Sequence, residues 1–216
     1  MVRAKIIETR RSQGERRDES RAKILAAAEQ IFARDGLEGA RTDAIAAAAG
    51  VNKALLYYYF KGKDSLYEAV IEQHLRDFNE QALKVLDAAG SPRTLLLQYV
   101  TMHFDFISAR QRHAPLFQQL MMKRGKPPEK LLIKYIAPRV EALQKLLLRG
   151  MKEGELREMD PMHTSISLAA LVIFYFSSAP MLQRFGYLDP YAPKTLKQRK
   201  HEILDFVRYG LFTIPD

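Results

Sequence analysis

The chain has 216 residues, a formal net charge of +9 and no cysteine, so disulfides, thiol catalysis and thiolate metal sites are excluded. Its hydrophobic content of 47% and charged content of 27% are typical of a folded globular protein. The length suits either one large core or a small domain of about 50 residues joined to a larger one of about 150.

The positive charge is concentrated near the N-terminus. Residues 1–63 carry 13 lysines and arginines against 8 acidic residues, so less than a third of the chain holds more than half of the net charge. Residues 1–19, with the pairs Arg10-Arg11 and Arg16-Arg17, are predicted to form a flexible basic arm. The arm is either a solvated tail or a segment that enters a DNA groove. It lacks the apolar stretch of a secretory signal, which predicts a cytoplasmic protein.

Residues 20–65 are predicted to form three short helices with a sharp turn before the third. The first begins at Ser20 as its N-cap, carries apolar residues at helical spacing and ends at Asp35-Gly36. The second ends at Ala49-Gly50-Val51, where glycine permits the left-handed conformation that a tight turn needs. This order is typical of a helix-turn-helix.

Asn52 is predicted to cap the third helix, Lys53–Tyr59, whose Leu56 and Phe60 face the core. The remaining side chains of this helix face solvent or a groove: Lys53, Ala54, Tyr57 and Tyr58.

The segment resembles the N-terminal domain of the TetR family of bacterial repressors. The residues that carry the resemblance are Ile24-Leu25, Ala27-Ala28, Phe32, Gly36, Ile45-Ala46, Ala49-Gly50-Val51, Leu56-Tyr57, Tyr59-Phe60, Lys63 and Leu66. The chain departs from the family pattern at Ala40-Arg41, where a serine or threonine usually caps the second helix, and at Tyr59, where a histidine is usual. We expect the cap to move to Thr42 and Tyr59 to remain a phosphate-facing donor.

The predicted DNA-binding residues are Arg41, Thr42, Asn52, Lys53, Ala54, Tyr57, Tyr58, Tyr59 and Lys63. A helix that enters the major groove by its N-terminus brings its first residues to the base edges, so Lys53 would donate to guanine and Ala54 would allow close approach. Tyrosine hydroxyls and the Lys63 ammonium suit phosphate oxygens. The resemblance implies this phosphate role for Tyr57, Tyr59 and Lys63.

Residues 66–216 are predicted to form a larger ligand-binding and dimerisation domain. Its helices are expected at Asp64–Ala88, from Pro92 onward, at Pro115–Met122, at Glu129–Glu153 with a kink or break at Pro138, from Asp160-Pro161 to Pro180, and at Thr195–Phe212. No alternating strand pattern occurs, so the fold class is all-α with about nine helices. The longest apolar run, Leu168–Phe176, is far shorter than the ~20 residues of a membrane span, and no membrane partner is predicted.

The resemblance implies an inducer pocket in this larger domain, for a small molecule that is mainly apolar or aromatic. The predicted pocket residues are His103, Phe104, Phe117, Met121, Tyr135 and Phe174. Aromatic residues at helical spacing are also typical of an ordinary core, and this alternative stays open. His103 would orient a polar group of the ligand; the alternative is a partly exposed histidine with a satisfied hydrogen bond.

The last two helices carry apolar stripes that a single core need not absorb. The resemblance implies that they form a two-helix contribution to a four-helix interface between two copies of the chain. The predicted interface residues are Ile166, Ala170, Ile173, Ile203, Val207 and Leu211. The alternative is a monomer in which both helices pack inward.

Patterns typical of an enzyme are missing from the sequence: it has no glycine-rich phosphate loop, no histidine pair at helical spacing and no recognisable catalytic triad. No cofactor or metal is predicted. The prediction is a homodimeric transcriptional repressor that binds a palindromic double-stranded DNA operator and is released by a small-molecule inducer. The first rival is a ligand-independent DNA-binding protein with the same reading head, which a filled core would favour. The second is a helical enzyme or carrier with an incidental basic face.

Overall fold

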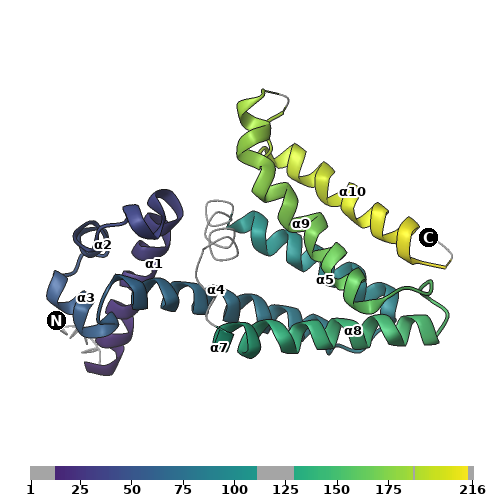
Figure 1. Ribbon diagram of the computed structural model, residues 1–216, viewed down its shortest axis with the longest axis horizontal. Coiled ribbons are helices and arrows are strands. Elements are labelled where there is room, and N and C mark those ends of the chain that lie inside the picture. Colours follow the sequence, from purple (N-terminus) through teal and green to yellow (C-terminus); the bar gives the residue numbers. More distant parts are fainter. Residues whose placement is uncertain (1–12, 111–128, 187, 214–216) are drawn as a thin grey trace, which may run out of the picture. The chain divides into compact units, whose positions relative to one another are not determined.

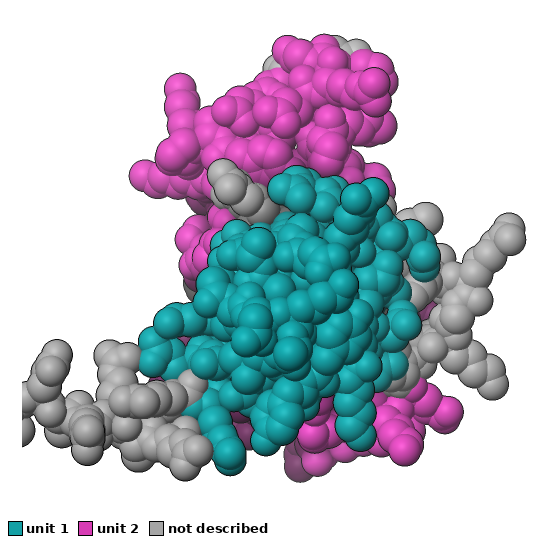
Figure 2. Space-filling model, turned by 90° about the vertical axis from the view of Figure 1, so that its left-hand side faces the viewer, with its two compact units in different colours: residues 1–70 teal, residues 71–216 magenta. Residues whose placement is uncertain are grey.

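The computed structural model describes residues 13–110, 129–186 and 188–213, and these residues form helices joined by short connections (Figure 1). The predicted all-α fold is confirmed. The helix predicted at Pro115–Met122 lies outside the described residues. The chain divides into two compact units, Met1–Val70 and Ile71–Asp216, coloured separately in Figure 2. The division falls inside one continuous helix, five residues after the boundary expected from the sequence.

Unit 1 contains α1 (Gln13–Gly39), α2 (Thr42–Ala48), α3 (Lys53–Phe60) and the start of α4 (Lys63–Leu86). Their apolar faces bury a small core that includes Ile24, Phe32, Ile45, Leu56 and Leu66, each shielded from solvent.

The prediction that the first helix begins at Ser20 is wrong, because α1 already includes Gln13. The polar residues before Ser20 have no apolar spacing to indicate a helix, but an i,i+4 ion pair between Glu19 and Lys23, at 2.9 Å, supports helical backbone there. The predicted end is confirmed, since Gly36 leaves the helical conformation with φ of 69°. α1 therefore bends at the glycine that the sequence indicated.

Unit 2 contains the rest of α4, then α5 (Pro92–Ala109), α7 (Glu129–Leu131), the π-helical turn η2 (Leu132–Ile136), α8 (Ala137–Lys152), α9 (Pro161–Arg184) and α10 (Pro193–Leu211). Helix α5 contacts α8, α9 and α10, and it lies between them in Figure 1. The core of unit 2 joins apolar residues of α4, α5, α8, α9 and α10, among them Leu96, Phe104, Leu147, Phe176 and Ile203.

The predicted starts of two helices of the second unit, at Pro92 and at Asp160-Pro161, are confirmed. Ser91 accepts a hydrogen bond from the amide of Thr94 at the start of α5, and Asp160 accepts one from the amide of His163 at the start of α9. A proline occupies the first turn of each, where its missing N–H group costs nothing.

Pro138 breaks the segment after Glu129 as predicted. The five residues before Ala137 form a π-turn in which the amide of Ala137 donates to the carbonyl of Leu132, and α8 begins with the proline in its first turn. The π-turn shifts the register of the side chains that precede α8 relative to those that follow it.

The prediction that α9 ends at Pro180 is wrong, because the helix continues to Arg184. Ala179 is buried and Leu182 packs against the core on either side of the proline, so burial offsets the hydrogen bond that proline cannot donate. By length and composition alone α9 could cross a membrane, but one of its faces, with Leu168 and Val172, is packed in the core of unit 2.

Gly150 marks the tightest approach in unit 2 and yields a stability prediction. A Cβ atom added there would lie 2.5 Å from Cδ1 of Leu156 and 3.0 Å from Cβ of Pro92, both of which are buried. We expect Gly150→Ala to lower the free energy of unfolding by about 1–3 kcal/mol through overpacking. Gly210→Ala is the control, because a Cβ added at this position meets nothing within 4 Å. This substitution should stabilise α10 by about 0.5–1 kcal/mol, since alanine favours a helix more than glycine does. Urea unfolding of both variants measures the difference, and equal effects would contradict this account.

Candidate functional site

The turn between α2 and α3 has the backbone geometry of a helix-turn-helix. Gly50 lies in the left-handed region with φ of 66°, and the amide of Val51 donates to the carbonyl of Ala46 at 3.0 Å. Asn52 then caps α3, as predicted, by accepting a 2.7 Å hydrogen bond at Oδ1 from the amide of Leu55. The turn and the cap together fix the direction in which α3 leaves the small core.

Helix α3 buries one face and exposes the other. Leu56 and Phe60 are buried, whereas the outer face carries the predicted set of exposed residues: Lys53, Ala54, Tyr57 and Tyr58. Tyr59 is half-buried, and its ring makes a T-shaped contact with the ring of Tyr58 at a centroid distance of 5.3 Å. The structure therefore brings four of the nine predicted DNA-binding residues onto one exposed helical face.

Lys53 has a partner that the sequence did not indicate. Its Nζ atom lies 2.8 Å from Oδ1 and 3.0 Å from Oδ2 of Asp43, on the preceding helix α2. The hydrogen bond to Asp43, together with the attraction between the two charges, raises the pKa of Lys53. Both side chains are at least half exposed, so the pair is readily exchanged for another anion, such as a phosphate, or for a base edge.

The other predicted DNA-binding residues lie at helix starts. Lys63 begins α4 and donates to the carbonyl of Glu38 at 3.2 Å, which leaves two of its three N–H groups for other acceptors. Arg41 is exposed and occupies the N-cap position of α2. The expected shift of the cap to Thr42 is wrong, because Thr42 is the first helical residue and no side chain caps α2. Asp43 in the first turn instead complements the helix dipole.

Unit 2 contains a cavity of about 70 Å³. Its wall is built from four helices and the C-cap of α5, and consists of His74, Leu75, Phe78, Tyr99, His103, Phe106, Ile107, Arg110, Arg139, Ala169, Ile173, Phe176 and Ser177. Most of these side chains are apolar, and a few polar groups point among them, which is the usual composition of a small-molecule site.

Of the predicted pocket residues that the structure describes, only His103 lines this cavity. Burial, and to a smaller extent the charge of Arg139, lower its pKa to about 3, so His103 is neutral at pH 7. Phe104 instead packs inside the core against Tyr175 and Phe176. Phe117 and Met121 lie outside the described residues.

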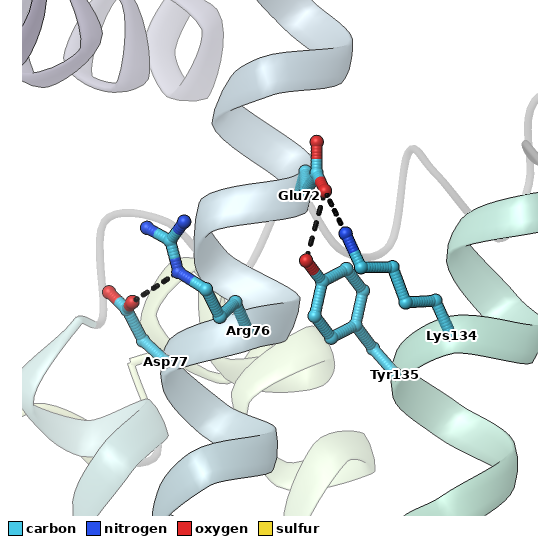
Figure 3. A network of polar contacts seen from close by, with 5 residues as sticks. All are labelled: Glu72, Arg76, Asp77, Lys134 and Tyr135. Atoms are coloured by element: carbon cyan, nitrogen blue, oxygen red, sulfur yellow. Dashed lines mark hydrogen bonds and ion pairs between the residues drawn. The ribbon is translucent and has the colours of Figure 1, made fainter.

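Tyr135 and Phe174 also lie away from the cavity wall. Figure 3 shows the hydroxyl of Tyr135 donating to Oε1 of Glu72 on α4, and Nζ of Lys134 donating to the same oxygen, each at 2.9 Å. These two hydrogen bonds lower the pKa of Glu72, and the one from Lys134 has the larger effect. Phe174 is 72% exposed on α9. We therefore correct both assignments: Tyr135 anchors η2 to α4, and Phe174 is a surface residue.

Sequence reasoning missed Arg139, although a signal was present. Tyr135, Arg139, Leu143 and Leu147 follow one another at steps of four residues, and the other three are buried. A charged residue on the inward stripe of an amphipathic helix is a departure that calls for a partner or a ligand. The guanidinium carbon of Arg139 lies 4.6 Å from the ring centroid of Phe78, and both residues line the cavity.

The predicted interface residues lie in three different places: on the surface, in the core of unit 2 and in the cavity wall. Ile166 and Ala170 are exposed on α9, but Ile203 and Val207 are only 1% exposed in the core of unit 2, and Leu211 packs against that core. Ile173 lines the cavity. The large apolar side chains that α10 does expose are Phe206 and Tyr209. An apolar stripe thus exists on both helices, but on α10 it contains other residues than those predicted.

Two models of known protein families match the chain. Residues 24–70 match the family model of bacterial regulatory proteins of the tetR family, and residues 92–207 match that of a tetracyclin repressor-like C-terminal domain. The second match alone spans more than half of the chain. The protein belongs to the TetR family of bacterial transcriptional regulators.

Individual relatives agree with this assignment. The chain is 31% identical over 164 residues to the HTH-type transcriptional regulator RutR of Escherichia coli, with 74% of this chain and 75% of the relative covered. It is 26% identical over 193 residues to the HTH-type transcriptional repressor NicS of Pseudomonas putida, with 88% and 89% covered. The ketosteroid transcriptional regulator KstR2 of Mycobacterium tuberculosis has the same fold, with a TM-score of 0.73 at 18% identity over 90% of this chain and 95% of that one.

Proposed function

We propose that this protein is a homodimeric repressor that binds a palindromic operator and releases it when a small molecule enters unit 2. The observation that carries the proposal is the outer face of α3, where Lys53, Ala54, Tyr57 and Tyr58 are exposed together beyond a capped turn. Lysine and alanine at the start of such a helix suit base edges in the major groove, and the tyrosine hydroxyls suit phosphates. A repressor of this kind acts in the cytoplasm, beside the DNA.

The cavity supports a ligand-responsive regulator over its ligand-independent rival. A core without free space was the expectation for that rival, and unit 2 instead has a cavity of about 70 Å³ bordered by His103 and Arg139. Helix α4 contributes His74, Leu75 and Phe78 to the cavity wall, and the same continuous helix begins with Lys63 in unit 1. Any ligand that binds better to one position of α4 therefore shifts the position of its first turn as well.

The homodimer is proposed to form through the exposed stripes of α9 and α10. Ile166 and Phe174 lie eight residues apart on α9, and Phe206 and Tyr209 lie three apart on α10, all more than half exposed. Large exposed apolar patches mark interaction sites. In a two-fold symmetric dimer the same patch of each copy contacts that of the other, so one exposed stripe is sufficient to form the interface.

The operator-binding part of the proposal is tested with duplexes selected from a random pool by the wild-type protein. We expect a two-fold symmetric site and binding that weakens steeply with salt, because phosphate contacts release counterions. Lys53→Ala should weaken binding to the selected site by about 5- to 150-fold and relax the preference at one base per half-site. Lys63→Ala should weaken all sequences alike and reduce the salt slope by about one per reading head.

Fluorescence anisotropy on the selected duplex and on a scrambled duplex, at several salt concentrations, separates these effects. Asp43→Asn serves as the matched control for Lys53, because it removes the partner of the lysine and leaves the lysine in place. It should retain the sequence preference of the wild type. Equal losses for Lys53→Ala on selected and scrambled DNA would show that Lys53 contacts only the backbone.

A further inference from the structure

The charged side chains that are described in the cavity wall are all positive. Two guanidinium groups, those of Arg110 and Arg139, border the cavity, and no aspartate or glutamate lies among the described residues that line it. The aromatic neighbours Phe106 and Phe78 lie 3.9 Å and 4.6 Å from the two guanidinium carbons. Aromatic faces attract a cation but leave its N–H donors without acceptors.

Arg139 has no carboxylate partner within the part of the chain that the structure describes. Burial lowers the pKa of Arg139, and among the described residues only Tyr99 opposes this shift; the pKa of Tyr99 is itself raised by burial, so Tyr99 is neutral at pH 7 and is no counter-ion. The sequence of residues 111–128, which lie outside the described part, contains neither aspartate nor glutamate, so that segment offers no carboxylate either. Arg139 is half-buried, and a cation that is partly withdrawn from water without a counter-ion is costly, so an anion that entered the cavity would reduce that cost.

His103 provides a second, independent polar group in the same wall. Its side chain is 5% exposed, and it makes ring contacts with Phe78 and Tyr99 but no hydrogen bond to any described residue. A neutral imidazole carries one N–H donor and one acceptor nitrogen. The donor can serve the same anionic group as Arg139, since both side chains border one small cavity.

We infer that the cavity binds a ligand that joins an apolar body to a carboxylate, with the carboxylate paired to Arg139 and accepting a hydrogen bond from His103. The cavity of about 70 Å³ is smaller than the cavity of about 150 Å³ that admits benzene. The apolar body is therefore small, or it extends past the half-buried side chains of Ile107, Ile173 and Ser177. The inference rests on the ligand response proposed above and specifies the ligand class.

Titration calorimetry with two sets of matched probes tests the inference. The first set is benzoate, benzamide and benzylammonium, and the second is hexanoate, hexanamide and hexylammonium. In at least one set, the wild-type protein should bind the carboxylate about 10- to 100-fold more tightly than the amide, because a charge-assisted pair replaces a neutral contact. The ammonium compound should bind most weakly, since the two guanidinium groups repel it.

Variants at Arg139 decide whether this residue carries the preference. Arg139→Met should make carboxylate and amide bind equally, and Arg139→Lys should retain part of the difference because it keeps the charge without the fork of donors. Lys145→Met is the control, since it removes an exposed cation from the same helix and should leave the preference intact. Arg139→Met should also be at least as heat-stable as the wild type, because it removes a half-buried charge that has no carboxylate partner among the described residues.

Two results would overturn the inference. Equal binding of carboxylate and amide by the wild type would leave a ligand site without anion selectivity, and binding of none of the six probes would show that the cavity does not take small apolar carboxylates. Calorimetry needs no DNA, so the proposed function fails separately. A protein that prefers the carboxylates but selects no operator would support the inference and contradict the proposed function.

Discussion

Acidification from about pH 6.5 to about pH 3 is expected to remove roughly 5 kcal/mol of unfolding free energy through His103 alone. Burial lowers the pKa of this imidazole from 6.5 to about 3 in the folded protein. The unfolded chain therefore binds a proton at His103 as the pH falls below 6.5, whereas the folded chain does not. The stability is fully present above pH 6.5 and is lost as the pH approaches the folded pKa.

The cause of this shift lies in the groups around the imidazole. Phe78 and Tyr99 pack against the ring, and the charge of Arg139 opposes protonation. The other titratable side chains of the cavity wall are His74 and Arg110, and α9 contributes no titratable group. No neighbouring carboxylate in the described wall stabilises the imidazolium, so desolvation is left uncompensated.

Urea unfolding of the wild type and of His103→Gln, measured at intervals between pH 7.5 and pH 4.5, isolates the contribution. The slope of the difference in unfolding free energy should approach about 1.4 kcal/mol per pH unit below pH 6. The variant His201→Gln provides the control, because this histidine is exposed on α10. A His103→Gln protein with the same pH dependence as the wild type would show that His103 is hydrated or paired in solution.

The double variant Ile166→Glu, Phe206→Glu is expected to abolish the proposed dimer. Both side chains are more than half exposed in one chain, and burying each against a partner is worth about 1.5–3 kcal/mol. Two-fold symmetry counts each substitution twice, so roughly 6–12 kcal/mol is lost and the dissociation constant rises by about 10⁴-fold or more. Operator affinity should fall with it, since a single reading head keeps only half of the contacts.

Sedimentation velocity of the full chain at micromolar concentration measures the outcome. Leu148→Glu is the matched control, because Leu148 is 54% exposed on α8, outside the proposed stripes, and its variant should remain a dimer. Circular dichroism checks that both variants are folded. A dimer mass for the double variant would place the contact on another surface. Val207 is unsuitable for this test because it is 1% exposed in the core, so a charge there would unfold unit 2.

The features that the sequence alone determined are local ones. Gly50 and Asn52 specify the turn and the cap of α3 through their own backbone and side-chain chemistry, and Asp160 does the same for α9. The break before Pro138 follows from a missing N–H group. Each of these depends on neighbours within five residues, so no knowledge of the fold was needed to predict them.

Tertiary packing decided which residue of each apolar stripe faces what. On α10, Val207 is buried and its neighbour Phe206 is exposed. Helical spacing predicts poorly which of two adjacent apolar residues is buried, because both faces of this helix carry apolar side chains. Phe104 joined the core and Phe174 the surface for the same reason. The cavity with Arg139 and the pairing of Lys53 with Asp43 arise only when separate helices meet, because the contacts involved join residues that the chain keeps ten or more positions apart.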